Sequence, residues 1–298
     1  MTQSVLCIGE CMVEFFPQPD GSYAQGFADD TFNMAWYLRR CLPADWTVDY
    51  FTALGDDPMS DRMAAFMSDA GIGTRHIPCL PGLAPGLYVI SLQDGERSFS
   101  YWRSQSAARH LAQDATALSR AFEGVGLLVL SGITLAILPD PDRQTLLDAV
   151  ATARKQGSRV AFDPNIRPRL WENPETMRHW ITQAAAPADI VLPSFDDDHR
   201  LFGDTTPADT AHRYLQTGAG LVIVKDGAGP VLWRSLHKEG QLHPPTVPHI
   251  IDTTAAGDSF NAGFLAAHLS GQDLPTAIAR GTALATKVIQ ARGALVEV

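Results

Sequence analysis

Short apolar runs recur along the whole chain, separated by longer stretches in which apolar residues return every three or four positions. Each run is closed by glycine or by a polar residue, as is typical of strands that are buried on both faces of a sheet. The predicted strands cover residues 4–9, 48–54, 127–131, 159–163, 189–192 and 221–225.

Helical patterns lie between these strands. The clearest spans residues 57–71: it begins with an Asp-Pro pair, places apolar side chains on one face and ends at a glycine. Two more helices are predicted near residues 143–156 and 175–186. Alternating strands and helices predict an α/β fold with a mostly parallel sheet that is covered on both faces, and with ligands beyond the carboxyl ends of the strands.

One segment departs from this alternation. Residues 87–92 and 97–102 alternate between apolar and polar side chains, and they flank Asp94 and Gly95, a pair that favours a tight hairpin turn. The sequence therefore predicts an antiparallel hairpin that is set apart from the parallel sheet as a flap.

The composition describes a folded protein with an acidic balance. With 298 residues, 45% of them hydrophobic, the chain is long enough to bury a large core. Its 23 Lys and Arg residues against 33 Asp and Glu residues give a formal net charge of -10. This charge argues against a nucleic-acid or anionic-membrane partner, although a local basic pocket for a small anion is compatible with it.

Residues 1–10 lack the basic start and the apolar run of a secretory signal, and no later stretch is apolar and long enough to span a bilayer. We therefore expect a soluble, cytoplasmic protein.

The chain has four cysteines, which form no CxxC pair and have no neighbouring histidine cluster: Cys7, Cys11, Cys41 and Cys79. Neither a zinc site nor a disulfide framework is indicated, and reduced, mostly buried thiols are expected.

The most informative segment is a turn of small residues near the C-terminus. Ala255, Ala256 and Gly257 precede a predicted helix that has Asp258 in its first turn. A helix start made of small residues presents unpaired N–H groups and the positive end of the helix dipole, which together favour an anion such as phosphate. Asp258 would then accept the proton of an attacking hydroxyl beside that phosphate. The alternative is that Asp258 caps the helix.

The segment Asp252–Phe260, with the sequence DTTAAGDSF, resembles the C-terminal signature D-T-x-G-A-G-D-x-F of the ribokinase-like (PfkB) sugar kinases. The resemblance implies that Asp258 is the catalytic base and that Ala255, Ala256 and Gly257 belong to the anion hole, with Gly257 also contacting the nucleotide. Ala255 stands where most members of the family have glycine.

The similarity extends over essentially the whole chain, through residues 7–14, 53–57 and 130–133. It implies a ribokinase-like three-layer sandwich with a mostly parallel central sheet. The expected organisation is a single kinase domain, residues 1–298, with a small β lid formed by roughly 10–34 and 86–108. The resemblance also implies ATP as co-substrate and Mg²⁺ as cofactor.

Three further segments are similar to the branch of this family that phosphorylates 2-keto-3-deoxygluconate, namely residues 85–88, 101–108 and 163–171. In this resemblance Tyr88, Tyr101 and Arg103 of the flap and Arg167 of a loop bind the sugar acid. A guanidinium can hold a carboxylate through two hydrogen bonds, and tyrosine hydroxyls can bond to sugar oxygens. Cross-strand packing of the tyrosines and a surface ion pair of Arg167 are the alternatives that these residues leave open.

The resemblance also assigns substrate contacts to Asp29, Asp30 and Asn33. The family usually has a Gly-Gly-Asp run here, whereas this chain has Ala28 and Asp29 in place of the two glycines. Glycine lets a ligand approach the backbone closely, and an added carboxylate repels an anionic substrate unless it points away from the pocket.

The nucleotide is expected beside Lys225, Gly227 and Gly229, which follow a predicted strand and resemble the ATP loop of the family. Ser194 and Asp197 stand where the family commonly has an N-x-x-E arrangement that governs magnesium and phosphate. Because Asp is shorter than Glu, a Mg²⁺ ion that Asp197 reaches through water fits this position, and Mg²⁺ usually keeps several waters.

The resemblance further implies a monovalent cation, such as K⁺, beside the anion hole. Carbonyl groups of the loop at Asp252 and Thr254 and of the turn at residues 292–294 would bind it.

The function implied by the resemblance is ATP-dependent phosphorylation of 2-keto-3-deoxygluconate to 2-keto-3-deoxy-6-phosphogluconate. The partners are then a small sugar acid and ATP. A flap with exposed aromatic side chains often pairs with another subunit, so a homo-oligomer, a dimer or higher, is expected.

Two alternatives stay open. One is another kinase of this family that acts on fructose, ribose or a different sugar acid, and the other is a non-catalytic sugar or nucleotide sensor on the same fold. A dinucleotide-dependent oxidoreductase is excluded, because the first strand runs into Ile8-Gly-Glu-Cys-Met12 without the G-x-G-x-x-G turn that pyrophosphate binding needs.

Overall fold

A computed structural model describes residues 2–93 and 96–298 of the chain. The main sheet consists of β1 (Ser4–Ile8), β4 (Thr47–Phe51), β9 (Leu127–Ser131), β10 (Arg159–Asp163), β11 (Ile190–Val191), β12 (Leu221–Val224), β13 (Val231–Ser235) and β14 (Glu239–Leu242). Its strand order is β14-β13-β12-β11-β10-β9-β1-β4, and it is parallel from β12 to β4. Only the pairs that involve β13 and β14 are antiparallel among these described strands.

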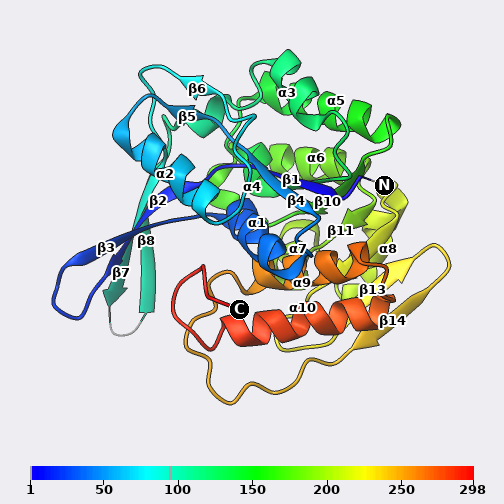
Figure 1. The fold of residues 1–298 in the computed structure, drawn as a ribbon. Helices are drawn as coiled ribbons and strands as arrows, with labels where there is room; N and C mark the ends of the chain where they lie inside the picture. Colours follow the sequence, from blue (N-terminus) through cyan, green and yellow to red (C-terminus); the bar gives the residue numbers. More distant parts are fainter. Residues whose placement is uncertain (1, 94–95) are drawn as a thin grey trace.

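Helices cover both faces of this sheet and give the three layers that the resemblance predicted. One face carries α3 (Ala115–Phe122), α4 (Gly132–Ala136), α5 (Asp140–Lys155), α6 (Pro174–Ala185), α7 (Phe195–Phe202) and α8 (Pro207–Thr217). The other face carries α1 (Asp30–Cys41), α2 (Pro58–Asp69), α9 (Ala256–Leu269) and α10 (Leu274–Val288). Figure 1 shows α3, α5 and α6 on one side of the sheet and α1, α9 and α10 on the other.

The core consists of two hydrophobic clusters, one on each face of the sheet. Alternate residues of a strand point to opposite faces. Ile8 and Leu130 therefore belong to one cluster, and their neighbours Cys7 and Val129 belong to the other. This burial on both sides is why the strands appear in the sequence as continuous apolar runs.

A second sheet lies apart from the main one. It consists of β2 (Met12–Pro17), β3 (Tyr23–Ala28), β7 (Leu87–Gln93) and β8 (Glu96–Trp102), in the order β3-β2-β7-β8. These strands extend from the body of the molecule at the left of Figure 1. The predicted hairpin strands pair antiparallel, with Tyr88 opposite Tyr101. The predicted turn at Asp94 and Gly95 lies outside the described residues.

Short elements complete the chain: β5 (Leu54–Gly55), β6 (Cys79–Leu80) and the single-turn 3-10 helices η1 (Ala107–His110) and η2 (Pro168–Leu170). Helix α2 begins as predicted, because the Asp57 side chain accepts hydrogen bonds from the N–H groups of Met59 and Ser60 at 2.8 and 3.2 Å. The helix expected near residue 143 begins earlier, at Asp140, with Pro139 as its N-cap residue.

The four cysteines lie within the described residues and form no disulfide. Cys7 and Cys11 are buried, whereas Cys41 and Cys79 are exposed, so the expectation of mostly buried thiols is wrong for the latter two. Cys41 ends α1 and Cys79 begins the short β6, positions that the core does not cover.

Within the described part of the chain, no helix has the length and the apolar character needed to cross a membrane.

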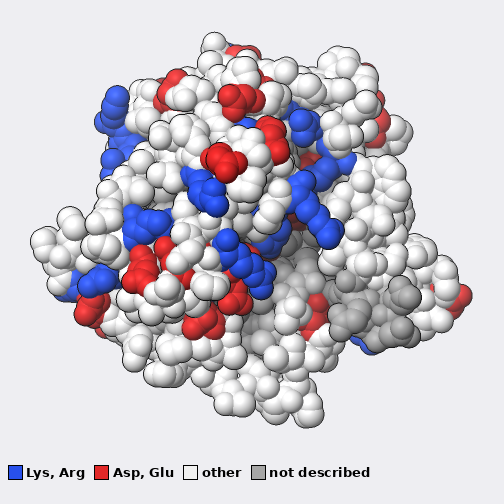
Figure 2. All heavy atoms as spheres, turned by 180° about the vertical axis from the view of Figure 1, so that it is seen from behind, with Lys and Arg blue, Asp and Glu red and all other residues white. Residues whose placement is uncertain are grey.

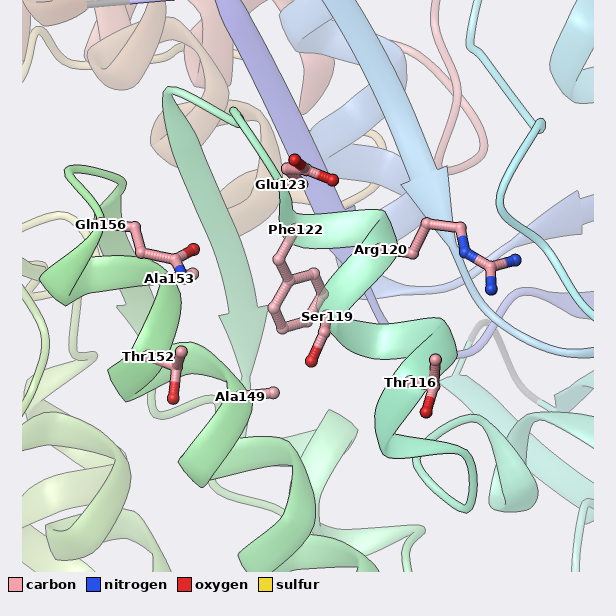
Figure 3. A pocket seen from close by; sticks show the side chains of 9 residues that line it. All are labelled: Thr116, Ser119, Arg120, Phe122, Glu123, Ala149, Thr152, Ala153 and Gln156. Atoms are coloured by element: carbon pink, nitrogen blue, oxygen red, sulfur yellow. The ribbon is translucent and has the colours of Figure 1, made fainter.

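The surface carries charges of both signs. On the face drawn in Figure 2, Lys and Arg side chains are interspersed with Asp and Glu side chains. A shallow groove of about 470 Å³ lies between α3 and the second half of α5, where side chains such as Ser119, Arg120 and Thr152 line it (Figure 3). None of the candidate site residues lines this groove.

Candidate active site

The candidate residues gather at the carboxyl edge of the main sheet. Glu10 follows β1, Asp163 ends β10, Ser194 follows β11 and Lys225 follows β12. The carboxyl ends of parallel strands lie along one edge, where ligands of such sheets bind. The start of α9 faces the same edge, because Nδ2 of Asn261 in α9 lies 2.6 Å from Oδ2 of Asp163.

The turn before α9 has the form that an anion site needs. Ala255 is the N-cap residue of α9 and has left-handed backbone angles, φ 57° and ψ 18°, and no side chain caps the helix. The N–H of Ala256 donates to the carbonyl oxygen of Thr253 at 3.2 Å, whereas those of Gly257 and Asp258 make no backbone hydrogen bond within the described residues. These two N–H groups are available to a ligand, and the helix dipole favours an anion there. The left-handed angles explain why glycine is common in the family at this position.

Replacing Ala255 by Gly is expected to raise the free energy of unfolding by about 1 kcal/mol, because glycine adopts left-handed backbone angles without steric cost. Turnover is expected to persist. Urea unfolding of the two proteins measures the difference. Ala256→Gly is the matched control: Ala256 is already helical, so this change should lower the stability by about 0.5 kcal/mol. Stabilisation by both glycines would contradict the role of the left-handed angles.

Asp258 lies in the first turn of α9 but is not its cap. Its Oδ2 instead accepts a hydrogen bond from Nδ2 of Asn33 in α1 at 2.8 Å. Burial, together with repulsion from Asp30 and Asp163, raises the pKa of Asp258 to about 8, while Asn33 and Lys225 oppose the shift. The helix-cap alternative is therefore wrong, and the carboxyl group faces the other candidate residues.

Lys225 is held at the anion turn by two side chains. Its Nζ donates to Oδ2 of Asp163 at 3.2 Å and to Oδ1 of Asn261 at 3.0 Å, and it lies 3.7 Å from the position that a Cβ atom on Gly257 would occupy. All three groups are largely buried. Sequence reasoning singled out neither Asp163 nor Asn261. Asn261 could have been found from its spacing. It lies three residues after Asp258 on the same predicted helix, and residues at this spacing share a helix face.

A second group of candidate residues lies on α1 and on the loop after β10. Oδ2 of Asp30 accepts a hydrogen bond from Nδ2 of Asn165 at 2.7 Å. Burial, and then repulsion from Asp29, raises the pKa of Asp30 to about 7. Oδ1 of Asn33 is buried and has no hydrogen-bond partner within the described residues. A buried oxygen without a partner is costly, so a hydroxyl donor from a ligand would be favourable there.

Arg103 is already paired on two sides. Its Nε donates to Oε2 of Glu10 at 2.8 Å, and its Nη2 donates to the same oxygen and, at 3.2 Å, to Oδ2 of Asp29. Asp29 therefore lies at the site rather than away from it. Sequence reasoning missed Glu10, which lies shortly after the end of β1. Its nearness to a buried strand was the available signal, because a buried charge needs a partner.

The two tyrosines of the second sheet form a cross-strand pair with ring centroids 5.9 Å apart, so the packing alternative is observed. The Tyr88 hydroxyl donates to Oε2 of Glu14, a residue that sequence reasoning missed. Tyr88 is buried, whereas Tyr101 is 52% exposed. Tyr101 is thus the more accessible of the two.

Arg167 forms the ion pair that was its alternative role. Its Nη1 lies 3.5 Å from Oδ2 of Asp197, and the Arg167 side chain is 51% exposed. Burial raises the pKa of Asp197, and Arg167 opposes this shift. The Arg167 charge also lowers the pKa values of Asp29 and Tyr101.

The predicted nucleotide loop has glycine at two positions where a side chain would be strained. Gly227 has a φ of 52°, and a Cβ atom on Gly229 would lie 2.6 Å from the Asp226 carboxylate. Ser194 is the N-cap residue of α7, and its hydroxyl makes no cap hydrogen bond. It forms a parallel bridge with Lys225, which brings the two predicted nucleotide segments side by side.

No group of three His, Cys, Asp or Glu side chains in the described residues could hold a metal ion by itself. A Mg²⁺ ion usually keeps several waters and binds through one or two carboxylates together with substrate phosphates. Ser194 and the partly exposed Asp197 are the side chains that could meet such an ion or its waters.

The two segments expected around a monovalent cation do meet. Oδ1 of Asp252 accepts hydrogen bonds from the N–H and the hydroxyl of Thr254, at 3.0 and 2.7 Å, and Oδ2 accepts one from the N–H of Gly293 at 2.7 Å. Asp252 therefore ties the turn at Gly293 to the loop before α9.

The raised pKa values predict how stability depends on pH. The pKa values of Asp29, Asp30 and Asp258 are raised to about 6, 7 and 8, whereas unfolded carboxyl groups lose their protons near pH 4. Between these limits the folded chain binds more protons than the unfolded chain, so its stability falls as the pH rises. We expect the Tm of the ligand-free protein to fall from pH 5 to pH 9. A Tm that rises over this range would contradict the buried carboxyl cluster.

A carboxylate beside an anion-binding helix start is the arrangement that phosphoryl transfer to a hydroxyl requires, so the fold and the site define a small-molecule kinase. The sequence profile of the pfkB family carbohydrate kinases matches residues 2–297, and the chain belongs to this family. A 2-dehydro-3-deoxygluconokinase of Haemophilus influenzae is 38% identical, over 99% of this chain and 96% of that protein.

Solved structures agree on the fold. The PfkB protein of a Polaromonas species is 30% identical, with a TM-score of 0.83 over 96% of each chain. A fructokinase of Xylella fastidiosa with bound ATP is 25% identical, with a TM-score of 0.84 over 99% of this chain and 94% of that one.

Proposed function

We propose that this chain transfers the γ-phosphoryl group of ATP to the terminal hydroxyl of 2-keto-3-deoxygluconate and releases 2-keto-3-deoxy-6-phosphogluconate. The observation that carries the proposal is Asp258, which lies at the uncapped start of α9, bonded to Asn33. The relative of Haemophilus influenzae, whose name specifies this sugar acid, supports the choice of substrate.

In the proposed reaction Asp258 accepts the proton of the sugar hydroxyl while the hydroxyl oxygen attacks the γ-phosphorus and ADP leaves. Asp258 must be ionised for this. Burial raises its pKa to about 8 in the free protein, and the nearby Lys225 charge opposes that shift. Lys225 and the N–H groups at the start of α9 also stabilise the charge on the transferring group. Mg²⁺ bound to the nucleotide phosphates would neutralise part of their charge, with Asp197 as the residue that would meet its waters.

The sugar acid would lie between α1 and the second sheet. The unpaired Oδ1 of Asn33 would accept a hydroxyl, the Tyr101 hydroxyl would bond to a sugar oxygen, and Arg103 and Arg167 would face the carboxylate. A neutral sugar such as fructose is the second candidate, because the charge of Arg103 is already opposed by Glu10.

We further propose that the second sheet acts as a lid over the substrate within a single domain, and that it pairs with the lid of another subunit. Its exposed aromatic side chains support this pairing: Tyr23, Phe99, Tyr101 and Trp102 are each at least 40% exposed. A homodimer or a higher homo-oligomer is therefore proposed, and the cytoplasm, where ATP is available, is the proposed compartment.

The substrate is tested with a coupled assay of ADP release across 2-keto-3-deoxygluconate, 2-ketogluconate, fructose and ribose. The expected result is the highest kcat/KM with 2-keto-3-deoxygluconate. A preference for fructose or ribose would overturn the assignment of an anionic substrate, and ATP binding without turnover of any of the four would favour the sensor.

We also propose a monovalent cation at the loop of Asp252 and Thr254, beside the turn at residues 292–294. The hydrogen bonds between Asp252 and Gly293 support it, because they hold the two loops together next to the start of α9. Activity is expected to be severalfold higher in KCl than in choline chloride at equal ionic strength. Equal activity in the two salts would refute the cation site and leave the phosphoryl-transfer proposal intact.

A further inference from the structure

Asp29 occupies a position between the helix layer and the second sheet. It is the N-cap residue of α1, where its Oδ1 accepts a hydrogen bond from the N–H of Asp30 at 2.9 Å. Its other oxygen, Oδ2, lies 3.2 Å from Nη2 of Arg103. The backbone of Asp29 is extended, with a φ of −177°, so nothing in its conformation requires glycine.

Arg103 therefore sits between two carboxylates. The exposed fractions of the side chains are 10% for Arg103, 0% for Glu10 and 11% for Asp29. Glu10 is enclosed, and its Oε2 receives two hydrogen bonds from the guanidinium, so it is the permanent partner. Asp29 contributes a single, longer hydrogen bond, and its side chain is not fully buried.

One nitrogen of the Arg103 guanidinium, Nη1, is still available as a donor. Within the described residues, Nη1 donates no hydrogen bond. A substrate carboxylate that bonded to Nη1 would bring a third negative group to a guanidinium that already faces Glu10 and Asp29. Repulsion between carboxylates in a low-dielectric site is large, and the usual relief is that one of them takes up a proton.

We propose that Asp29 is a specificity-determining residue that competes with the substrate carboxylate for Arg103, so that binding of the sugar acid is coupled to the uptake of a proton by Asp29. Of the two carboxylates, Glu10 has no access to solvent, whereas Asp29 is bonded to Arg103 through one oxygen only. A protonated Asp29 keeps its cap on α1 and can still accept from Nη2, but it no longer repels the incoming carboxylate.

The surroundings of Asp29 support a proton there. Burial raises its pKa to about 6, Glu10 adds to the shift, and Arg103 and Arg167 oppose it. Repulsion between Asp29 and Asp30 in turn raises the pKa of Asp30. The Asp29 charge also affects one thiol and three phenol groups, which are neutral near pH 6 because their pKa values are raised. These groups are Cys11, Tyr50, Tyr88 and Tyr101.

This inference rests on the proposed function, because it requires an anionic substrate. A bound carboxylate raises the pKa of Asp29 further, so the affinity for the sugar acid should fall as the pH rises above the pKa of free Asp29. Each pH unit between the free and bound pKa values changes the affinity by up to tenfold. We expect the KM for the sugar acid to rise by about tenfold between pH 6 and pH 8.

Asp29→Asn tests the coupling, because Asn keeps the size of the side chain, caps helices as well as Asp does and carries no charge. The expected KM for the sugar acid is about tenfold lower than that of the wild type at pH 8 and equal to it near pH 6. The weaker pH dependence that remains in the variant comes from Asp30 and Asp258, whose pKa values are raised to about 7 and 8. The KM for ATP and kcat should change by less than about twofold. Asp29→Gly, which has the residue usual in the family, should show the same weaker pH dependence.

Proton uptake is measured directly by calorimetry of sugar-acid binding, without ATP, in two buffers that differ in ionisation enthalpy. The wild type should take up a substantial fraction of one proton per sugar acid at pH 7, and Asp29→Asn should take up clearly less. Asp114→Asn is the matched control, because Asp114 is also an N-cap aspartate, at the remote α3, and it should behave as the wild type.

The outcomes separate this inference from the proposed function. If the wild type phosphorylates the sugar acid but Asp29→Asn shows the same pH profile and the same proton uptake, the role of Asp29 is wrong and the function stands. If the wild type turns over only neutral sugars, the proposed function fails first. A change in kcat alone, with an unaltered KM profile, would also contradict the inference.

Discussion

Asp258→Asn is expected to lower kcat by a factor on the order of 10³, because the amide cannot accept the proton of the sugar hydroxyl. The change keeps the size of the side chain and its contact with Nδ2 or Oδ1 of Asn33, so the site should keep its shape. The affinity for ATP should therefore stay nearly unaltered. Single-turnover measurements, with ATP binding followed separately, distinguish the loss of the chemical step from a loss of binding.

The same variant should be more stable than the wild type. Asp258 carries a charge that burial and two neighbouring aspartates disfavour, so removing the charge stabilises the folded state most above pH 8. The Tm of Asp258→Asn should exceed that of the wild type at pH 8.5, and the two should agree near pH 5. Near-normal turnover in this variant would show that another group is the base, whatever its stability.

Lys225→Met is expected to have the second largest effect, and it should act on two properties at once. Loss of the ammonium group beside the anion turn should lower kcat/KM by about 10²-fold, since a positioned charge near the transferring group is worth a few kcal/mol. The change also leaves the buried Asp163 without its cation. Breaking one partner out of a buried ion pair typically costs about 3 kcal/mol of stability.

A second substitution separates these two effects. In Asp163→Asn/Lys225→Met the unpaired charge is removed, so urea unfolding should show that most of the lost stability returns. Turnover should remain as low as in Lys225→Met alone, because the charge beside the start of α9 is still absent. Recovery of turnover together with stability would mean that Lys225 only supports the fold.

Both predictions depend on the same feature, a cluster of carboxyl groups at the carboxyl edge of the sheet. Asp30, Asp163 and Asp258 lie close enough for the first two to raise the pKa of the third, and Lys225 lowers it. Such a cluster costs stability in the free protein. The cluster is consistent with a site arranged for a charged reaction rather than for the stability of the empty fold.

The sequence was sufficient to predict the elements whose formation depends on neighbouring residues. The buried strands showed as apolar runs, the helix at Pro58 showed its Asp57 cap, and the hairpin strands showed alternation. The anion turn was also visible, since small residues directly before an apolar helical run leave the N–H groups of the helix start open to an anion. The bounds were less accurate, as for the helix that begins at Asp140, because tertiary contacts set where helices begin.

Partners distant in the sequence were not predictable in this way. The bond between Asn33 and Asp258 joins residues 225 positions apart, and that between Asn261 and Asp163 joins residues 98 apart. Nothing in the local pattern around Glu10 indicates that it would bind Arg103. A side chain's neighbours across the fold depend on strand order and on helix packing, neither of which a single sequence states.

The sequence by itself thus determined the class of fold, the anion turn and the chemical type of the candidate base. The tertiary structure alone decided that Asp258 is not a cap, that Lys225 is held by Asp163, and that Asp29 faces Arg103. The physical reason is the range of the interactions. Hydrophobic periodicity and turn geometry are properties of neighbouring residues, whereas burial, charge pairing and the resulting pKa shifts arise only when distant segments pack together.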